Sequence, residues 1–178
     1  MLRRSGWLIV ICFLMMMSCK HFMTAKEGKG TLNTCAEKTA AGGEFMLKIE
    51  DADLVQDSSD PESNTAEWSF SVEQPGRYEV WLSSITCDTM NMGFDTAVTI
   101  TAGDSRLEKV PMGDEIIAND NTIRTPWYRA DSEMGSVFFN KAGEYTVQVI
   151  SEKVVTPAVK DSDNKTLIKS IILKPVTY

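Results

Sequence analysis

Residues 70–82 read FSVEQPGRYEVWL, and residues 137–149 read VFFNKAGEYTVQV. The two segments align without gaps, and each has a Gly at its centre with a Tyr two positions later. Apolar residues recur at alternate positions, which is the period of a strand that buries one face and exposes the other. Gly permits the backbone conformations of a tight turn. Each segment is therefore predicted to be a strand, a turn and a second strand, with Tyr78 and Tyr145 facing the core.

This repeat has two explanations. The segments are either a true internal repeat or two unrelated hairpins that share the same turn chemistry, and in both cases we expect them to be structural equivalents within one domain. A solenoid is not indicated, because stacked repeats need more than two copies to bury a core.

The chain beyond residue 43 has strand character throughout. No segment sustains apolar residues at helical spacing, and Gly, Pro, Asn and Asp separate the apolar runs. The predicted strands are residues 45–50, 67–72, 77–85, 96–101, 106–112, 127–130, 136–140, 144–150 and 167–174. Regularly spaced short strands predict an all-β fold, an antiparallel β-sandwich or jelly roll.

The N-terminus has the pattern of a secreted lipoprotein. Arg3 and Arg4 precede an apolar run at residues 7–17 that stops at Ser18-Cys19. The run is shorter than the roughly 20 apolar residues that a transmembrane helix needs, so it is typical of a signal peptide. Residues 16–19 resemble the bacterial lipobox, in which the Cys after the cut is lipidated. The alternative is an ordinary signal peptide with an incidental Cys.

We therefore expect a signal peptide at residues 1–18, a lipidated Cys19 with a flexible tether through residue 43, and a β-domain at residues 44–178. The net charge of −7 argues against nucleic-acid binding, which needs basic residues to neutralise phosphates. Attachment to a membrane should come from the lipid. Lys20 stands where many bacterial lipoproteins have an Asp that retains them at the inner membrane, which favours the outer membrane of a Gram-negative cell.

Two cysteines remain after Cys12 leaves with the signal peptide and Cys19 is lipidated. Cys35 and Cys87 can pair in an oxidising envelope, but a sequence cannot show whether their Cα atoms come within bridging distance. The disulfide therefore stays open. A metal site built from these two thiols and the remote His21 is disfavoured.

Several pieces of the chain resemble the galactose-binding-like β-sandwiches, in particular the carbohydrate-binding modules of families 6 and 35. They are an opening strand that ends in acidic residues at 49–53, the segments 70–82 and 137–149, Trp127, and a final strand at 168–173. The resemblance spans about residues 45–175. It implies a non-catalytic domain that binds a glycan.

The chain departs from this family at its metal site. The resemblance implies a structural calcium held by opening carboxylates and an Asp of the last strand, as suits an ion that takes oxygen ligands. Glu50 and Asp53 are present, but Lys169 replaces the final Asp and would repel the cation. We therefore expect no metal and no cofactor.

Trp127 and Tyr128 are the leading ligand candidates. Trp127 matches the family's Trp, and the C–H face of a pyranose packs on an aromatic ring while polar groups take its hydroxyls. Asp120, Asn121 and Asn164 would supply those groups, although Asn164 is near the family's Asn position and not at it. The alternative for Trp127 is a structural role at the edge of the core.

Trp81 and the loop around Asn91 are further candidates. Trp81 points to the face opposite Tyr78 and marks a binding surface if that face is solvated, or ordinary packing if it is covered. The loop at residues 86–95 contains Met90, Asn91 and Phe94, and it serves either to bind a partner or to fold over the sandwich.

Catalysis finds little support, because His21 is the chain's one His and no phosphate loop or zinc motif is present. We expect a glycan-binding lipoprotein of the cell envelope that recognises a glycan or glycoprotein and assists polysaccharide capture. The alternative is a protein-interaction or assembly module of an outer-membrane complex.

Overall fold

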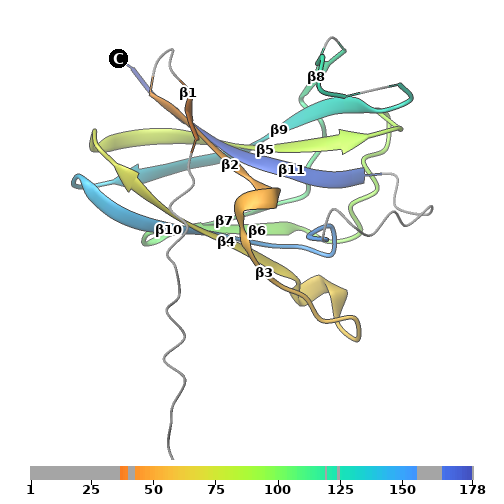
Figure 1. Ribbon diagram of the computed structural model, residues 1–178, viewed down its shortest axis with the longest axis horizontal. Coiled ribbons are helices and arrows are strands. Elements are labelled where there is room, and N and C mark those ends of the chain that lie inside the picture. The colour runs from red at the N-terminus through yellow and green to blue at the C-terminus, as the bar shows by residue number, and fades with distance from the viewer. Residues whose placement is uncertain (1–36, 40–42, 119, 124, 156–165, 178) are drawn as a thin grey trace, which may run out of the picture. The chain divides into compact units, whose positions relative to one another are not determined.

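The computed structural model describes residues 37–39, 43–118, 120–123, 125–155 and 166–177. Two antiparallel sheets pack face to face (Figure 1). This confirms the predicted antiparallel β-sandwich. The predicted signal peptide, Cys19, His21, Cys35 and Asn164 lie outside the described residues.

One sheet has six strands and the other has five. In spatial order, the six-stranded sheet contains β1 (Glu37–Thr39), β2 (Glu44–Lys48), β11 (Thr166–Pro175), β5 (Gly76–Thr86), β9 (Tyr128–Phe139) and β8 (Glu115–Ile117). The five-stranded sheet contains β3 (Asp53–Val55), β4 (Thr65–Val72), β10 (Gly143–Ile150), β6 (Val98–Ala102) and β7 (Ser105–Lys109). Two short 3-10 helices, η1 (Ile49–Asp51) and η2 (Pro61–Ser63), flank β3.

Most of the strands lie where the sequence predicts them, with two differences. The segments 127–130 and 136–140 belong to one strand, β9, whose alternation is interrupted where the register shifts between Glu133 and Gly135. Gly135 has φ 131°, and a Cβ there would come within 3.2 Å of Leu107 Cδ2, so the bulge needs Gly. The edge strands β1, β3 and β8 were not predicted because three residues are too few to show a period. β1 lies in the range expected to be a tether.

The repeated segments are not hairpins, which corrects the prediction. β4 pairs with β10 and β5 pairs with β9, so within each segment the two strands belong to opposite sheets. Residues 73–75 and 140–142 therefore cross from one sheet to the other, and we call each segment an arch. Alternation is the same in a hairpin and in an arch, because both bury every second residue.

The two arches pair with each other about a local twofold axis. Tyr78 lies opposite Val137, and Tyr145 lies opposite Phe70. Each tyrosine hydroxyl donates a hydrogen bond to a carbonyl four residues upstream, Tyr78 to Gln74 at 2.8 Å and Tyr145 to Lys141 at 2.9 Å. The arches are thus structural equivalents within one domain.

The sandwich has two unlike ends. At the arch end the core is aromatic, with ring centroids 4.6–6.0 Å apart among Phe45, Phe70, Tyr78, Phe139 and Tyr145. At the loop end, strands end at Thr86 and Ile150, and their partners begin at Tyr128, Thr166 and Thr65. The long connections, including residues 87–97 and 110–127, meet there. Several residues buried toward this end carry hydroxyl groups: Ser84, Thr86, Thr99, Ser132, Ser151 and Thr166.

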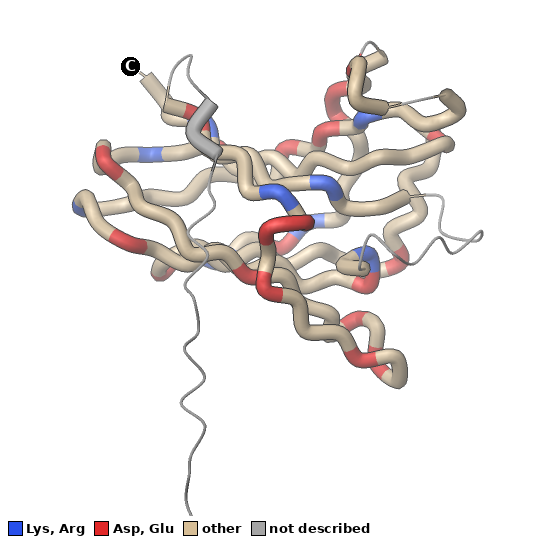
Figure 2. Tube along the Cα trace, viewed as in Figure 1, with Lys and Arg blue, Asp and Glu red and all other residues tan. Residues whose placement is uncertain are grey.

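Charge is distributed unevenly along the fold. Acidic residues follow one another through η1, β3 and η2, whereas the basic Lys48 and Lys169 lie on neighbouring strands of the six-stranded sheet (Figure 2). Within the described residues, no helix has the length and apolarity needed to cross a membrane.

Candidate functional site

A small cavity lies beside Trp127 at the loop end of the six-stranded sheet. Its volume is about 220 Å³, and it is lined by Ile85, Thr122, Ile123, Trp127 and Leu167. Ile85 of β5 and Leu167 of β11 are direct cross-strand neighbours. Their parity is opposite to that of the buried Leu82 and Ile168, so they form a floor on the outer face of the sheet. Trp127 directly precedes β9 and follows the cis Thr125–Pro126 peptide bond.

A buried ion pair flanks this floor. Arg129 lies opposite Ile85, and its Nε and Nη2 donate to the two oxygens of Asp131 at 2.9 and 2.7 Å. Nε also contacts Ser83 Oγ at 3.0 Å. The side chain of Asp131 is 2% exposed. A two-point contact of this kind fixes the plane of the guanidinium group.

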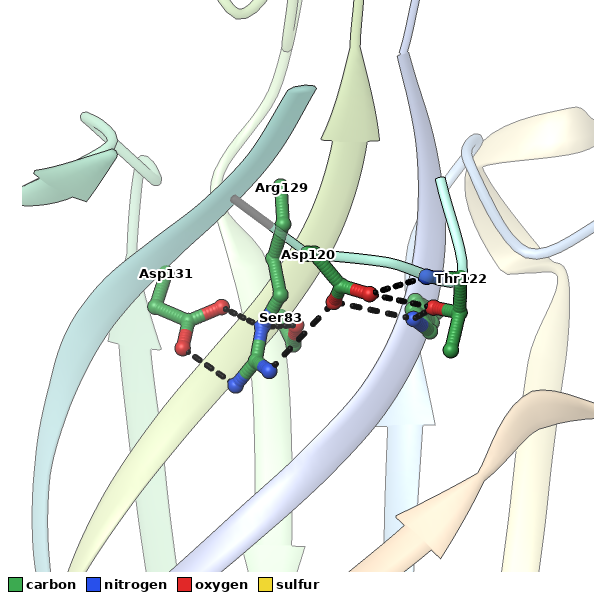
Figure 3. Close-up of polar contacts among 6 residues, drawn as sticks. Ser83, Asp120, Thr122, Arg129 and Asp131 are labelled. Atoms are coloured by element: carbon green, nitrogen blue, oxygen red, sulfur yellow. Dashed lines mark hydrogen bonds and ion pairs between the residues drawn. The ribbon is translucent and has the colours of Figure 1, made fainter. Parts of the chain in front are cut away.

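A second acidic residue, Asp120, connects the Arg129–Asp131 pair to the loop that precedes β9. Asp120 Oδ2 lies 3.7 Å from Arg129 Nη1 and 3.5 Å from Lys169 Nζ (Figure 3). Its Oδ1 accepts hydrogen bonds from the backbone N–H and the hydroxyl of Thr122. Lys169 Nζ also donates to Thr122 Oγ1 at 2.9 Å. These contacts attach residues 120–122 to β9 and β11.

The electrostatics of this network favour full ionisation. The hydrogen bond from Thr122, assisted by Lys169, lowers the pKa of Asp120 to about 2, against a smaller opposing effect of burial. The hydrogen bonds that Arg129 donates to Asp131 raise the pKa of the Arg129 guanidinium. The network therefore holds two carboxylates and two cations, each with a partner of opposite sign. It can accept or donate hydrogen bonds at its edge, but an ionised Asp120 has no proton to give.

The structure brings several of the predicted ligand residues to this end. Trp127 lines the cavity, Tyr128 begins β9 half-buried, Asp120 belongs to the ion network, and Asn121 is exposed between Asp120 and Thr122. Asn91 also lies in a loop-end connection, where its Oδ1 accepts the N–H of Gly93 at 2.9 Å. Asn164 lies outside the described residues.

Trp81 lies elsewhere. It occupies the middle of β5 on the outer face, as its parity predicts, and Lys174 Nζ lies 4.4 Å from the centroid of its ring. Its indole N–H points to Glu79 Oε2 at 3.4 Å. Trp81 is thus half-covered by neighbouring charged side chains.

The loop at residues 86–95 is partly buried and partly exposed, and its predicted role in binding a partner stays a prediction. Met92 is 4% exposed, and Phe94 packs against the core, whereas Met90 is 94% exposed. Asp88 Oδ1 accepts the N–H groups of Met90 and Asn91 and so holds the turn that presents them. Half of the loop folds over the sandwich, and its tip projects into solvent.

Sequence reasoning missed the apolar floor and the basic half of the ion network. Ile85 and Leu167 carried one usable signal, because they are apolar residues at positions whose parity predicts solvent. Arg129 and Asp131 carried another, since residues two apart on a strand share a face. Lys169 was considered only as a substitute for a calcium ligand, and its amino group bonds to Asp120 and Thr122. Cys87 is half-buried after β5, and the disulfide that the sequence leaves open would join it to Cys35, which lies outside the described part of the chain.

Comparison with known proteins supports the fold alone. No family model matches the sequence, and no curated protein matches it. Among solved structures, an α-L-fucosidase from Vibrio sp. strain EJY3 aligns with a TM-score of 0.58 and 23% identity over 75% of this chain. A Podospora anserina GH26-CBM35 β-(1,4)-mannanase aligns with a TM-score of 0.46 and 16% identity over 76% of this chain. The chain matches 22% of the fucosidase and 28% of the mannanase chain.

Proposed function

We propose that this protein is a non-catalytic glycan-binding lipoprotein of the bacterial cell envelope, and that it binds a sugar at the Trp127 cavity. The observation that carries the proposal is the placement of Trp127 in the lining of an apolar cavity whose residues Thr122 and Ile85 neighbour the ion network, through Asp120 and Arg129 respectively. The shared fold with part of an α-L-fucosidase and the resemblance to family 6 and 35 carbohydrate-binding modules give it further support.

The arrangement suits recognition of a sugar ring. The C–H face of the ring would pack on Trp127, and ring hydroxyls at the cavity edge would meet Asp120 and Arg129. Because the ion pairs already hold these groups in place, little side-chain entropy would be lost when the sugar binds.

The same network argues against glycosidase chemistry at this cavity. A retaining or inverting glycosidase needs one carboxyl group that remains protonated near neutral pH. The pKa of Asp120 is held near 2, and Asp131 is bonded at both oxygens to Arg129. Asp120 therefore does not meet the requirement for a general acid, and both oxygens of Asp131 are occupied by Arg129.

We further propose that Cys19 carries the lipid and that the protein is displayed on the outer membrane of a Gram-negative cell. The tether would let the domain sample polysaccharide near the surface. Metabolic labelling with an alkyne fatty acid tests this part. Label should enter the wild-type chain and be absent from a Cys19→Ala variant, and equal labelling of both would contradict it.

A glycan array tests the binding proposal. The purified protein is compared with Trp127→Ala and with Trp81→Ala, which removes a half-exposed Trp away from the cavity. We expect selective binding that Trp127→Ala abolishes and Trp81→Ala retains. Binding that depends on Trp81 instead would move the site, and no binding to any glycan would overturn the proposal.

A second function is favoured by one observation. Met90 is 94% exposed and Met112 is 71% exposed, and exposed methionines are typical of adaptable protein-binding surfaces. An assembly module of an outer-membrane complex would use them. Cross-linking in intact cells distinguishes the two functions, because a Met90→Ser and Met112→Ser variant should lose its cross-linked partner and keep its glycan binding.

A further inference from the structure

The lining of the Trp127 cavity is too apolar to match a sugar ring that carries a hydroxyl group at every position. The side chains of Ile85, Ile123, Trp127 and Leu167 form most of its lining. All four are partly exposed, so apolar surface stays in contact with water until a ligand covers it. Covering that surface with hydrocarbon is favourable.

The remaining lining residue, Thr122, has little hydrogen-bonding capacity left. Its hydroxyl donates to Asp120 Oδ1 and accepts from Lys169 Nζ. A hydroxyl has one proton and two lone pairs, so a single lone pair of Thr122 remains for a ligand. A sugar hydroxyl placed against the cavity walls would lose its bonds to water and recover at most one.

We propose that this cavity receives a methyl group carried by a sugar, either the C6 methyl of a 6-deoxyhexose or the acetamido methyl of an N-acetylhexosamine. This inference rests on the proposed function and names the ligand class of the same site. The methyl group fills the space over Ile85 and Leu167, and the ring hydroxyls point toward Asp120 and Arg129, which adjoin the lining residues Thr122 and Ile85.

A contrasting surface on the same molecule shows what a polar site looks like. The outer face of the five-stranded sheet has a wider depression of about 460 Å³, whose lining includes Glu67, Thr101, Asp104, Glu144 and Gln148. Carboxylates and hydroxyls dominate there. The Trp127 cavity has neither on its floor, which is why a methyl group is the better match.

Matched sugar pairs test the inference on the full chain. The methyl glycosides of L-fucose and L-galactose differ by one hydroxyl at C6, and those of N-acetylglucosamine and glucose differ by the acetamido group. Binding is followed by NMR at the Trp127 indole N–H, which a Trp127→Phe variant assigns. We expect the methyl-bearing member of one pair to bind at least fivefold more tightly, and the pair concerned identifies which methyl is recognised.

A floor variant sharpens the test. Ile85→Thr preserves β-branching, removes the Cδ1 methyl group and places a hydroxyl on the floor. It should reduce the preference within the responding pair to less than twofold, whereas Trp81→Ala should keep the wild-type ratio. The wild-type comparison decides the question even where Ile85→Thr folds poorly, which its circular dichroism would reveal.

The outcomes separate the two proposals. Equal affinities within both pairs, or tighter binding of the galactoside and glucoside, would overturn the methyl assignment and leave glycan binding standing. An unperturbed Trp127 resonance with every sugar, together with a negative glycan array, would overturn the proposed function and this inference with it.

Discussion

The arch end and the loop end of the sandwich differ in the side chains that pack there. Five aromatic rings pack at the arch end, and Tyr78 and Tyr145 brace the two arches through equivalent hydrogen bonds. The loop end has buried hydroxyls inside and an ion network with an open cavity outside. Dense apolar packing contributes far more to stability than partly exposed ion pairs do. The comparison indicates that the arch end contributes more to the stability of the fold than the loop end, where we propose that the ligand binds.

The largest effect is expected from Phe139→Ala at the arch end. Phe139 is 1% exposed and lies 4.6–5.8 Å from the rings of Phe70, Tyr78 and Tyr145. Its removal should lower the free energy of unfolding by about 3–5 kcal/mol, measured by urea denaturation. Phe138→Ala, at a 62% exposed neighbour, is the control and should change it by less than about 0.5 kcal/mol. Similar losses in both variants would contradict the division between the ends.

A smaller loss is expected from Asp131→Asn at the loop end. The variant leaves the Arg129 guanidinium without the carboxylate that holds it at 2.7 Å, although Asp120 and solvent compensate in part. We expect a loss of about 2 kcal/mol in the free energy of unfolding, accompanied by weaker sugar binding. Glu133→Gln, at an exposed acid on the same strand, should leave both unchanged. If Asp131→Asn lowers stability and leaves sugar binding unchanged, the ion network takes no part in binding.

Acid should loosen the loop end through Asp120. Its pKa falls from 3.8 to about 2 in the folded state, so its contribution to stability is fully present above about pH 4 and is lost as pH falls toward 2. Because Lys169 is partly solvated, the contribution should be about 1 kcal/mol. The difference in unfolding free energy between pH 6 and pH 3 should shrink in Asp120→Asn. If the pH 6 to pH 3 difference is the same in Asp120→Asn as in the wild type, Asp120 does not cause the loss of stability in acid.

The smallest effect, and one of opposite sign, is expected from Ser84→Ala. Among the described residues, the Ser84 hydroxyl is fully buried and has no hydrogen-bond partner. Its removal should raise the free energy of unfolding by up to about 1 kcal/mol. Thr86→Val is the matched comparison and should lower the free energy of unfolding by a similar amount, because the Thr86 hydroxyl accepts a 2.8 Å hydrogen bond from Thr166 and donates one to the Asp88 carbonyl. Destabilisation by Ser84→Ala would indicate a partner for that hydroxyl.

Much of the fold could be predicted because burial on one face leaves a period of two in the sequence. Tyr78, Val80 and Leu82 are buried as their parity predicts, and Trp81 faces outward. The pairing of the strands could not be predicted, since period two does not say which strand lies next to which. The arches were therefore interpreted as hairpins, although β5 pairs with β9 and β11.

The candidate site was predictable in part for the same reason. Trp127 could be proposed from its own chemistry and its match to a family pattern. The floor beneath it could not, because Ile85 and Leu167 become neighbours only through the pairing of β5 with β11. The bond of Lys169 to Asp120 likewise joins a strand to a distant loop.

The pairing of the arches has a consequence for how the chain folds. Neither arch contains a ladder of its own, so β4 and β5 have no β10 and β9 to pair with until residues 128–150 are available. Such distant pairing makes folding slow, because the entropy of closing a long loop is lost before the contacts form. A nascent chain of this topology cannot form the pairs between the arches until most of it has been synthesised. That delay is an advantage for a polypeptide that, as proposed, is threaded through a membrane before it folds.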